Sequence, residues 1–551
     1  MRNKPEWSEW VLATGMAFAA MILPWLYLPL SEPFEMDEGY QALCVADYQR
    51  SPLAMLIFYV GNLWTQFFGT GYLALRYLSC LEGYVAILIG CGYYLWRRRN
   101  LYRTLWIFSF CALLAAVERH SMYNWDTGAY PFYALLLVMS LEYLRRPGIF
   151  RALLLGLSVI MVVLARVQLA ILFPVFGVLV AASARSNREL IVKETAFYLV
   201  GAVAGFVILA SLMCGSVCKY VAVFTGENII SGHAPADFYR FWYITKETIL
   251  ERSLRSTLTL LAFASGIWLA VSRSRWQRYA SAGFILIVMG AAMGILKTDR
   301  GAAMYGMEGV TAMITVLLLI VLPLYNVCCK KRRIAVPRRA LIAVWIIFSA
   351  PAFGSDYWFA RFNAFYLIGP TLAIVEPLLL SRPLLKRIAQ KTFICLYLAF
   401  ASVFAGRLYA AYAYAPQSYD LLAECKGLRG GAETYSEWLF VSNLHEALDS
   451  VGARVNFDGD RFGFSYSWQR ETVTNLHRFH FSSSPENVAK RREVASLYDA
   501  WIFVFVKPEE VSAVCDMLEE EGFVHVQVDK PYVILYLRPD FIEKLLQRVL
   551  K

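Results

Sequence analysis

Charged residues are scarce in this sequence. They make up 17% of the 551 residues, whereas a typical soluble domain carries about 25%. Apolar residues reach 58%, and they form long segments over the first three quarters of the chain. This composition excludes a disordered chain and a collagen-like chain. It is typical of a polytopic membrane protein.

Cysteine and histidine motifs are also missing. Most of the 11 cysteines lie inside apolar segments, with no CxxC pair and no cluster with histidine. The sequence therefore indicates neither a disulfide scaffold nor a metal centre. Cys425 and Cys515 lie outside the apolar segments and could pair, which the sequence leaves open. No cleavage site follows the first apolar segment, which we interpret as an anchor rather than a signal peptide.

Apolar segments long enough to approach a membrane crossing recur about thirteen times, at roughly 20 residues for each crossing. The predicted spans are Val11–Leu30, Tyr77–Trp96, Thr104–Val117, Gly128–Leu144, Ala152–Ala165, Val167–Ala184, Ala196–Gly215, Ser256–Val271, Ala280–Leu296, Gly309–Val327, Ala340–Phe353, Asn363–Leu380 and Phe393–Ala405. A further apolar stretch, Leu53–Phe68, is predicted to lie at the membrane surface as an amphipathic segment.

Basic residues cluster after the even-numbered spans. The clusters are Arg97, Arg98, Arg99 and Arg103; Arg145, Arg146 and Arg151; Arg185, Arg188 and Lys193; Arg273, Arg275 and Arg278; Lys330 to Arg333 with Arg338 and Arg339; and Arg382, Lys386, Arg387 and Lys391. Cytoplasmic loops carry such an excess. We therefore expect a cytoplasmic N-terminus, an extracytoplasmic C-terminal domain and a place in the bacterial inner membrane. The net charge of +11 is then a topology signal rather than a nucleic-acid footprint.

The last quarter of the chain is different in composition. Residues 416–551 hold 15 basic and 21 acidic residues, and we expect them to form a soluble α/β domain after a membrane domain at 1–415. Predicted helices cover Glu433–Val451 and a segment from Lys507 to Glu521, and predicted strands cover Arg454–Phe457, Asp499–Val506, Val524–Val528 and Tyr532–Leu537. Gly427–Gly431 is predicted as a loop and Asp458–Asp460 as a turn. This part has no P-loop, nucleophile elbow or dinucleotide-binding glycine pattern.

Loops on the expected outer side carry mixed charge. They are Ser31–Ser51, Glu118–Thr127, Ser216–Arg255, Lys297–Glu308 and Gly354–Phe362. Charge at a membrane boundary is costly unless it is solvated or paired. Several such loops predict a polar cavity on the outer face.

The first of these loops has an ordered motif. The acidic pair Asp37-Glu38 is followed by Arg50-Ser51-Pro52-Leu53, by Phe68-Gly69 and by Arg76. This order resembles the N-terminal signature of the GT-C superfamily of membrane glycosyltransferases, which includes protein O-mannosyltransferases and lipid A aminoarabinose transferases. Three details depart from the family pattern: Arg50 stands where many members have lysine, only one of two prolines is present, and the gap from Asp37 to Arg50 is much shorter than in the lipid A transferases.

The resemblance implies a reaction. The family transfers a sugar from a polyprenyl-phosphate lipid to a hydroxyl of a lipid, polysaccharide or protein, with inversion and without a metal or other cofactor. Asp37 would be the general base, Glu38 would orient it or bind the acceptor, and Asp126 would hold the sugar or acceptor. Arg50 would stabilise the departing phosphate. Further basic residues available for the donor are Arg76, Arg119, His120, Arg166, Lys297, Arg300 and Arg361.

Each assignment has a structural alternative. Asp37-Glu38 could be the acidic first turn of a helix over Gly39–Tyr48, and Asp126 could cap a helix. Arg50 and Arg76 could bind lipid headgroups. His120 could be an ordinary loop histidine.

Two acidic residues within predicted spans have no assigned role. Glu82 and Glu376 fall within spans, where each could pair with a basic group or lie near a cavity. A lipid transporter or flippase, or a non-catalytic relative, is the alternative to the enzyme.

Overall fold

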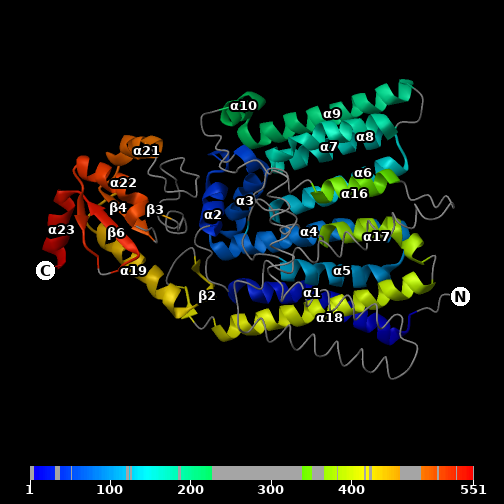
Figure 1. Cartoon of the computed structure of the whole chain (residues 1–551), viewed down its shortest axis with the longest axis horizontal. Helices are drawn as coiled ribbons and strands as arrows, with labels where there is room; N and C mark the ends of the chain where they lie inside the picture. The colour runs from blue at the N-terminus through cyan, green and yellow to red at the C-terminus, as the bar shows by residue number, and fades with distance from the viewer. Residues whose placement is uncertain are drawn as a thin grey trace.

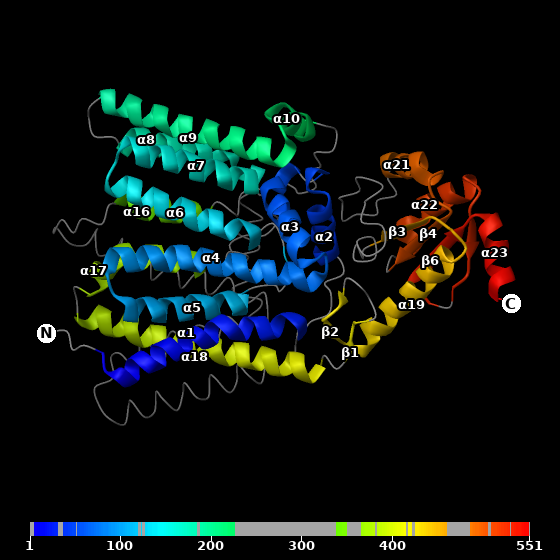
Figure 2. The ribbon, with the colours of Figure 1, turned by 180° about the vertical axis from the view of Figure 1, so that it is seen from behind.

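The computed structural model describes residues 5–30, 37–50, 52–118, 123, 127–183, 188–225, 338–349, 365–380, 383–414, 417–420, 425–459, 485–504, 508–528 and 530–549. Within these ranges a bundle of helices occupies the first three quarters of the chain, and an α/β unit follows it. Figures 1 and 2 show the bundle helices side by side, with the α/β unit beyond one end of the bundle and the N-terminus at the other.

The bundle helices follow the predicted apolar segments. They are α1 (Trp7–Tyr27), α4 (Tyr72–Arg98), α5 (Leu101–Glu118), α6 (Tyr130–Arg145), α7 (Ile149–Ala165), α8 (Leu172–Ser183), α9 (Arg188–Cys214), α16 (Arg338–Ser349), α17 (Phe365–Leu380) and α18 (Pro383–Tyr414). Each predicted span up to residue 215 and from residue 340 onward overlaps one of them. The spans predicted at Ser256–Val271, Ala280–Leu296 and Gly309–Val327 lie outside the described residues.

Four helical stretches in the described ranges are long and apolar enough to cross a membrane: Trp7–Leu30, Tyr72–Arg98, Glu189–Cys214 and Gln390–Ala413. Large apolar side chains also cover outward faces of the bundle. On α9, Val203, Ile208 and Leu212 are 60%, 58% and 60% exposed. A helix that is apolar both inside and outside is typical of a lipid environment. The chain is an integral membrane protein.

Glycines allow the closest helix contacts in the bundle. A Cβ on Gly201 of α9 would lie 2.1 Å from the carbonyl oxygen of Leu153, and one on Gly156 of α7 would lie 2.0 Å from that of Tyr198. The two backbones therefore touch, as small residues permit between membrane helices. Gly90 and Gly369 do the same for α4 and α17, where the missing Cβ of Gly369 would meet the Gly90 carbonyl at 2.7 Å.

Short elements cover one end of the bundle. They are η1 (Leu28–Leu30), α2 (Asp37–Ala46), η2 (Tyr48–Arg50), η3 (Pro52–Ala54), α3 (Met55–Phe68), η4 (Thr127–Ala129), η5 (Val167–Ile171) and α10 (Val217–Thr225). Figure 1 shows α2 and α3 running across the ends of the bundle helices. We call this end the α2 end. The opposite end, which holds the basic junctions α4–α5, α6–α7, α8–α9 and α17–α18, is the basic end.

The predicted surface segment 53–68 is a surface element over only part of its length. Met55, Ile57 and Phe58 at the start of α3 are at most 1% exposed, because they pack under other elements. Phe67 and Phe68 at its far end are 80% and 61% exposed. The helix therefore enters the protein at one end and presents aromatic rings at the other.

The α/β unit has a mixed sheet in the order β3-β4-β6-β5, with β3 parallel to β4 and the other pairs antiparallel. Its elements are β1 (Gln417–Ser418), β2 (Arg429–Gly430), α19 (Ala432–Asp449), β3 (Val455–Gly459), α21 (Pro485–Ala495), β4 (Ala500–Val504), α22 (Pro508–Glu520), β5 (Val524–Val526), β6 (Val533–Leu537) and α23 (Pro539–Val549). Trp501 and Phe503 of β4 pack with α22, whereas Ile502 and Val504 join the core that includes α19. Both faces of the central strand are therefore covered.

Several predictions for this part need correction. Asp458 and Gly459 are not in a turn, because β3 continues through them in register with Phe503 and Val504 of β4. Part of the predicted 427–431 loop pairs as β2 with β1. Helices α21 and α23 were not predicted. Cys425 is buried in a loop and Cys515 lies on α22, and no disulfide joins these two residues.

Candidate functional site at the α2 end

A buried ion pair fixes the first predicted site residues. Glu38, the second residue of α2, is 1% exposed, and Arg76 in the second turn of α4 is fully buried. Arg76 donates from Nε to Glu38 Oε1 and from Nη2 to Oε2, both at 2.7 Å. This fork-to-fork geometry is the strong, directional form of an arginine–carboxylate contact.

The same arginine holds a third segment. Its Nη1 donates to the carbonyl oxygen of Leu28 at 2.9 Å, at the end of α1 where a helix leaves carbonyls without intrahelical partners. Arg76 therefore joins α1, α2 and α4. The arginine lies inside the protein rather than on the lipid-facing surface.

Asp37 begins α2 directly before this pair. The alternative interpretation placed Asp37-Glu38 at a helix start, and that placement is confirmed. It did not foresee that Glu38 points inward, away from the solvated position that a dipole-stabilising acid usually takes. The side chain of Asp37 is not among those described, and neither is that of Arg50, the last residue of η2. The backbone alone puts both residues at the α2 end.

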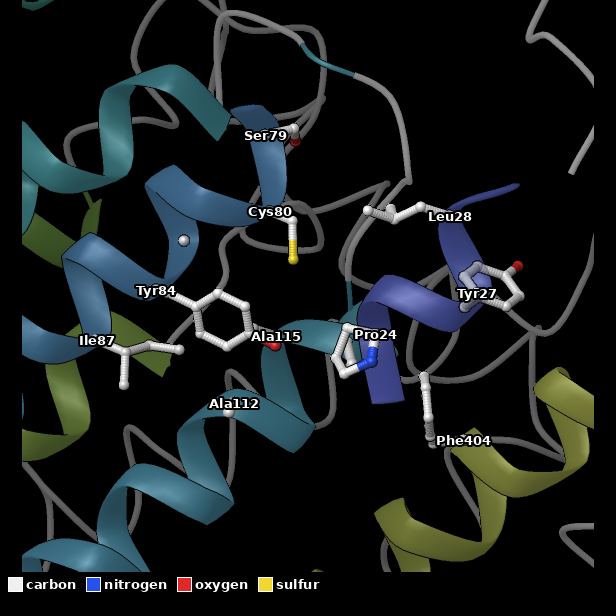
Figure 3. A pocket seen from close by; sticks show the side chains of 12 residues that line it. Pro24, Tyr27, Leu28, Ser79, Cys80, Tyr84, Ile87, Ala112, Ala115 and Phe404 are labelled. Atoms are coloured by element: carbon white, nitrogen blue, oxygen red, sulfur yellow. The ribbon is translucent and has the colours of Figure 1, made fainter. Parts of the chain in front are cut away.

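A cleft lies between α1, α4, α5 and α18 (Figure 3). It is lined mainly by small or apolar residues of α1, α4, α5 and α18. The small side chains of Ala112 and Ala115, and the absence of one at Gly83, leave room for the cleft. Tyr27 and Phe404 also line it, with ring centroids 6.4 Å apart. We call it the apolar slot.

Pro24 shapes the slot from inside α1. A proline has no N–H to give to the carbonyl four residues earlier, which here is Ala20. The hydroxyl of Tyr84 on α4 points to that carbonyl at 3.2 Å and donates to Met21 at 2.7 Å. Tyr84 therefore supplies a donor where the helix lacks one, and its ring forms a slot wall.

The slot and the ion pair share structure. Leu28 lines the slot, and its carbonyl accepts from Arg76. Ser79, one turn after Arg76 on α4, lines it as well. One end of the slot is therefore next to the Glu38–Arg76 ion pair that holds α2.

Tyr123, in the predicted second outer loop, is anchored to α3. Tyr123 is fully buried and donates from its hydroxyl to the Ile57 carbonyl of α3 at 2.6 Å. Burial, with the nearby charge of Glu82 as a smaller cause, raises the pKa of Tyr123 well above its ordinary value. The tyrosine is therefore a hydrogen-bond donor at any physiological pH. The sequence analysis did not single out this anchoring residue, although an aromatic inside a charged loop was the available signal.

Arg166 is also at this end. It ends α7 immediately before η5, is 7% exposed and donates from Nη2 to Gln168 at 3.3 Å. Arg119, His120, Asp126, Lys297, Arg300 and Arg361 lie outside the described residues. The structure thus brings Glu38 and Arg76 into contact and sets the backbone of Asp37 beside them.

Glu376 has a different place. It lies at the basic end, where Arg103 and Tyr94 donate to it. The alternative that this intramembrane acid pairs with a basic group is confirmed. Within the described ranges, no three His, Cys, Asp or Glu residues lie close enough to hold a metal ion.

Comparisons with known proteins give one solved structure to report. No model of a known protein family matches the chain, and no curated protein matches it. The crystal structure of ArnT from Cupriavidus metallidurans bound to undecaprenyl phosphate aligns over 96% of this chain and 98% of its own, with 14% identity and a TM-score of 0.40. Membership of a family is therefore a proposal, to be argued from this chain's own residues.

Proposed function

We propose that this chain is an integral membrane glycosyltransferase of the GT-C superfamily. It would transfer a sugar from a polyprenyl-phosphate-linked donor to an acceptor hydroxyl on the extracytoplasmic face. One observation carries the proposal. The helix that opens with Asp37-Glu38 is locked across the end of a membrane bundle by a buried arginine, beside an apolar slot.

Asp37 is the proposed general base. An acceptor hydroxyl must lose its proton as it attacks the sugar, and a carboxylate within reach of that proton can take it. Inversion requires one such displacement, with the hydroxyl attacking from the face opposite the departing lipid phosphate. Asp126 is proposed to hold the sugar or the acceptor. No metal or other cofactor enters this scheme.

Basic residues are proposed to take the charge that develops on the leaving phosphate. Arg50 is the first of them, and Arg166 is at the same end of the bundle. The remaining candidates are Arg119, His120, Lys297, Arg300 and Arg361. Fixed positive groups in a water-poor site stabilise such charge more strongly than water does.

Glu38 and Arg76 have a positioning role in this scheme. Glu38 neutralises Arg76, so this arginine is not needed for the phosphate. The pair instead fixes the start of α2, and thus the backbone from which Asp37 extends. A base displaced by about 1 Å can lose a hundredfold in rate.

The apolar slot suits the hydrocarbon part of the donor. It lies between membrane helices, and its walls combine small side chains with aromatic and aliphatic ones. A polyprenyl chain is flexible and apolar, and burying each CH₂ group contributes about 0.8 kcal/mol. The slot's position next to the Glu38–Arg76 ion pair would bring the lipid's phosphate end toward the proposed base.

Asp37 is the residue to test. We expect Asp37→Asn to lower sugar transfer from a radiolabelled polyprenyl-phosphate donor by at least about a hundredfold, the scale of general-base catalysis. Asp47→Asn, ten residues along the same outer loop, is the matched control and should retain transfer. A nucleotide-sugar offered in place of the lipid donor should give none.

The experiment separates the alternatives. Full transfer by Asp37→Asn would reject the base but keep the enzyme. Wild-type protein that moves labelled lipid between the leaflets of vesicles, yet forms no new glycosidic bond, would favour the transporter or flippase instead.

A further inference from the structure

The basic end contains two copies of one arrangement, and neither takes part in the proposed reaction. In each copy a glutamate from another helix is held by a tyrosine and an arginine of α4, with a second arginine added from α5 or α6. Tyr93 and Arg97 form one pair on α4, and Tyr94 and Arg98 form the next. Residues four apart share a helix face, so consecutive pairs serve two different neighbouring helices.

The first copy faces α6. Tyr93 donates to Glu142 Oε1 at 2.9 Å. Arg145 Nη1 lies 3.4 Å from Oε2, and Arg97 Nε lies 3.8 Å from Oε1. Both arginine contacts are long, and both side chains are about 30% exposed. These guanidinium groups therefore keep N–H donors available to a further acceptor.

The second copy faces α17. Tyr94 donates to Glu376 Oε2 at 3.0 Å, Arg98 Nε lies 3.6 Å from the same oxygen, and Arg103 donates to Oε1. Arg98 also donates to the Ala373 carbonyl. The side chains of Arg98 and Arg103 are 27% and 31% exposed. Each copy thus holds two arginines against one carboxylate, so among the described residues each carries a surplus of one positive charge.

Trp96 indicates how deep in the membrane these arginines lie. It is 49% exposed between the two α4 pairs, and the Arg97 guanidinium carbon lies 5.7 Å from its ring centroid. Exposed tryptophan on a membrane helix is typical of the level of the lipid headgroups. The surplus guanidinium groups are therefore at the depth of lipid phosphates.

We propose that these arginines, Arg97 with Arg145 in the first copy and Arg98 with Arg103 in the second, bind the phosphate headgroups of anionic phospholipids. The glutamates orient the guanidinium groups and set the net charge, while the lipid phosphate takes the free donors. Basic sites between membrane helices are suited to such headgroups. The site is separate from the α2 end and does not depend on the proposed reaction.

The test titrates purified full-length protein in neutral detergent with phosphatidylglycerol and follows bound lipid by native mass spectrometry. Phosphatidylcholine is titrated in a parallel experiment, and we expect phosphatidylglycerol to bind more tightly than phosphatidylcholine. At about fivefold for each arginine, Arg97→Gln with Arg145→Gln should weaken phosphatidylglycerol binding about 25-fold. Lys193→Gln is the matched control, since Lys193 is a basic residue near the start of α9 whose partner is the exposed Glu189. It should bind as the wild type does.

A second variant is expected to change lipid binding in the opposite direction, which a misfolded protein would not do. Glu142→Gln removes a negative charge and leaves the arginines, so phosphatidylglycerol should bind more tightly. Equal binding of both lipids, unchanged binding by the double variant, or weaker binding by Glu142→Gln would overturn the proposal. Inorganic phosphate that displaces the lipid at low millimolar concentration would also overturn it, since the site would then recognise free phosphate.

Discussion

At the scale of single residues, the Glu38–Arg76 pair is the most consequential contact at the α2 end. Both side chains are at most 1% exposed. Taking charges out of water is costly, and breaking such a pair by removing one partner typically destabilises a protein by about 3–5 kcal/mol. Neutralising both partners removes the stranded charge and so costs less.

We therefore expect Arg76→Gln and Glu38→Gln each to lower the apparent melting temperature in detergent strongly. The double variant should lie above either single variant. Arg492→Gln is the control, because its partner Glu520 is 65% exposed and such surface pairs contribute about 0–1 kcal/mol. Additive losses in the double variant would mean that the two residues act separately.

Charged residues inside helices explain where prediction from sequence stopped short. The predicted second span began at Tyr77, whereas α4 begins five residues earlier because Arg76 has a partner that makes its burial possible. The predicted seventh span began at Ala196, whereas α9 begins at Arg188 and includes Glu194, which accepts from Tyr143 at 2.6 Å. These partners lie 38 and 51 residues away along the chain. No local pattern in one sequence identifies them.

At the scale of elements, helix contacts in the bundle depend on missing side chains. The α7–α9 pair shows this best, because Gly201 meets the backbone of Leu153 and cannot accept even one methyl group without moving a helix. Backbone atoms cannot turn aside as a flexible side chain can. Overpacking of this kind costs about 1–3 kcal/mol or more.

Gly201→Ala should therefore lower the apparent melting temperature, although alanine favours helices by about 1 kcal/mol over glycine. Gly92→Ala on α4 is the matched control, since nothing lies within 4 Å of the added Cβ. That variant should be neutral or slightly stabilising. If both variants behave alike, helix propensity rather than packing governs the site.

Helices and strands were predicted most accurately where a long run of apolar residues marked them. Apolar length alone located the bundle helices in the described ranges, and short runs of apolar residues located β4 and β6. Helix α23 was missed because it is short and half polar, with Phe541, Ile542 and Leu545 packing on one side only. The motif in the first outer loop identified α2 as important, but the apolar slot depends on helices that meet only in three dimensions.

At the scale of the whole molecule, the two ends of the bundle differ in kind. The basic junctions gather at one end, and the α/β unit lies beyond the other (Figure 2). The distribution of basic residues predicts that the basic end faces the cytoplasm. The orientation remains a prediction, and a native cysteine can test it.

Cys218 on α10 is exposed and lies at the α2 end. We expect a membrane-impermeant maleimide to label it in intact spheroplasts, as read from the peptide that contains Cys218. Cys218→Ser should abolish that signal without other change. Labelling of this peptide only after lysis would reverse the orientation, and the proposed site would then face the cytoplasm.

Helix α4 forms an ion pair near each of its ends: Arg76 with Glu38 at one end, and Arg97 with Glu142 at the other. At 1.5 Å for each residue, the two arginines are about 31 Å apart along the helix, close to the hydrocarbon thickness of about 30 Å. Arg76 ties α4 to α1 and α2, and Tyr93, one turn before Arg97, donates to Glu142 of α6, so a shift of α4 along its axis would break contacts at both ends. A bilayer thinner or thicker than this spacing would therefore have to adapt to α4, rather than α4 to the bilayer.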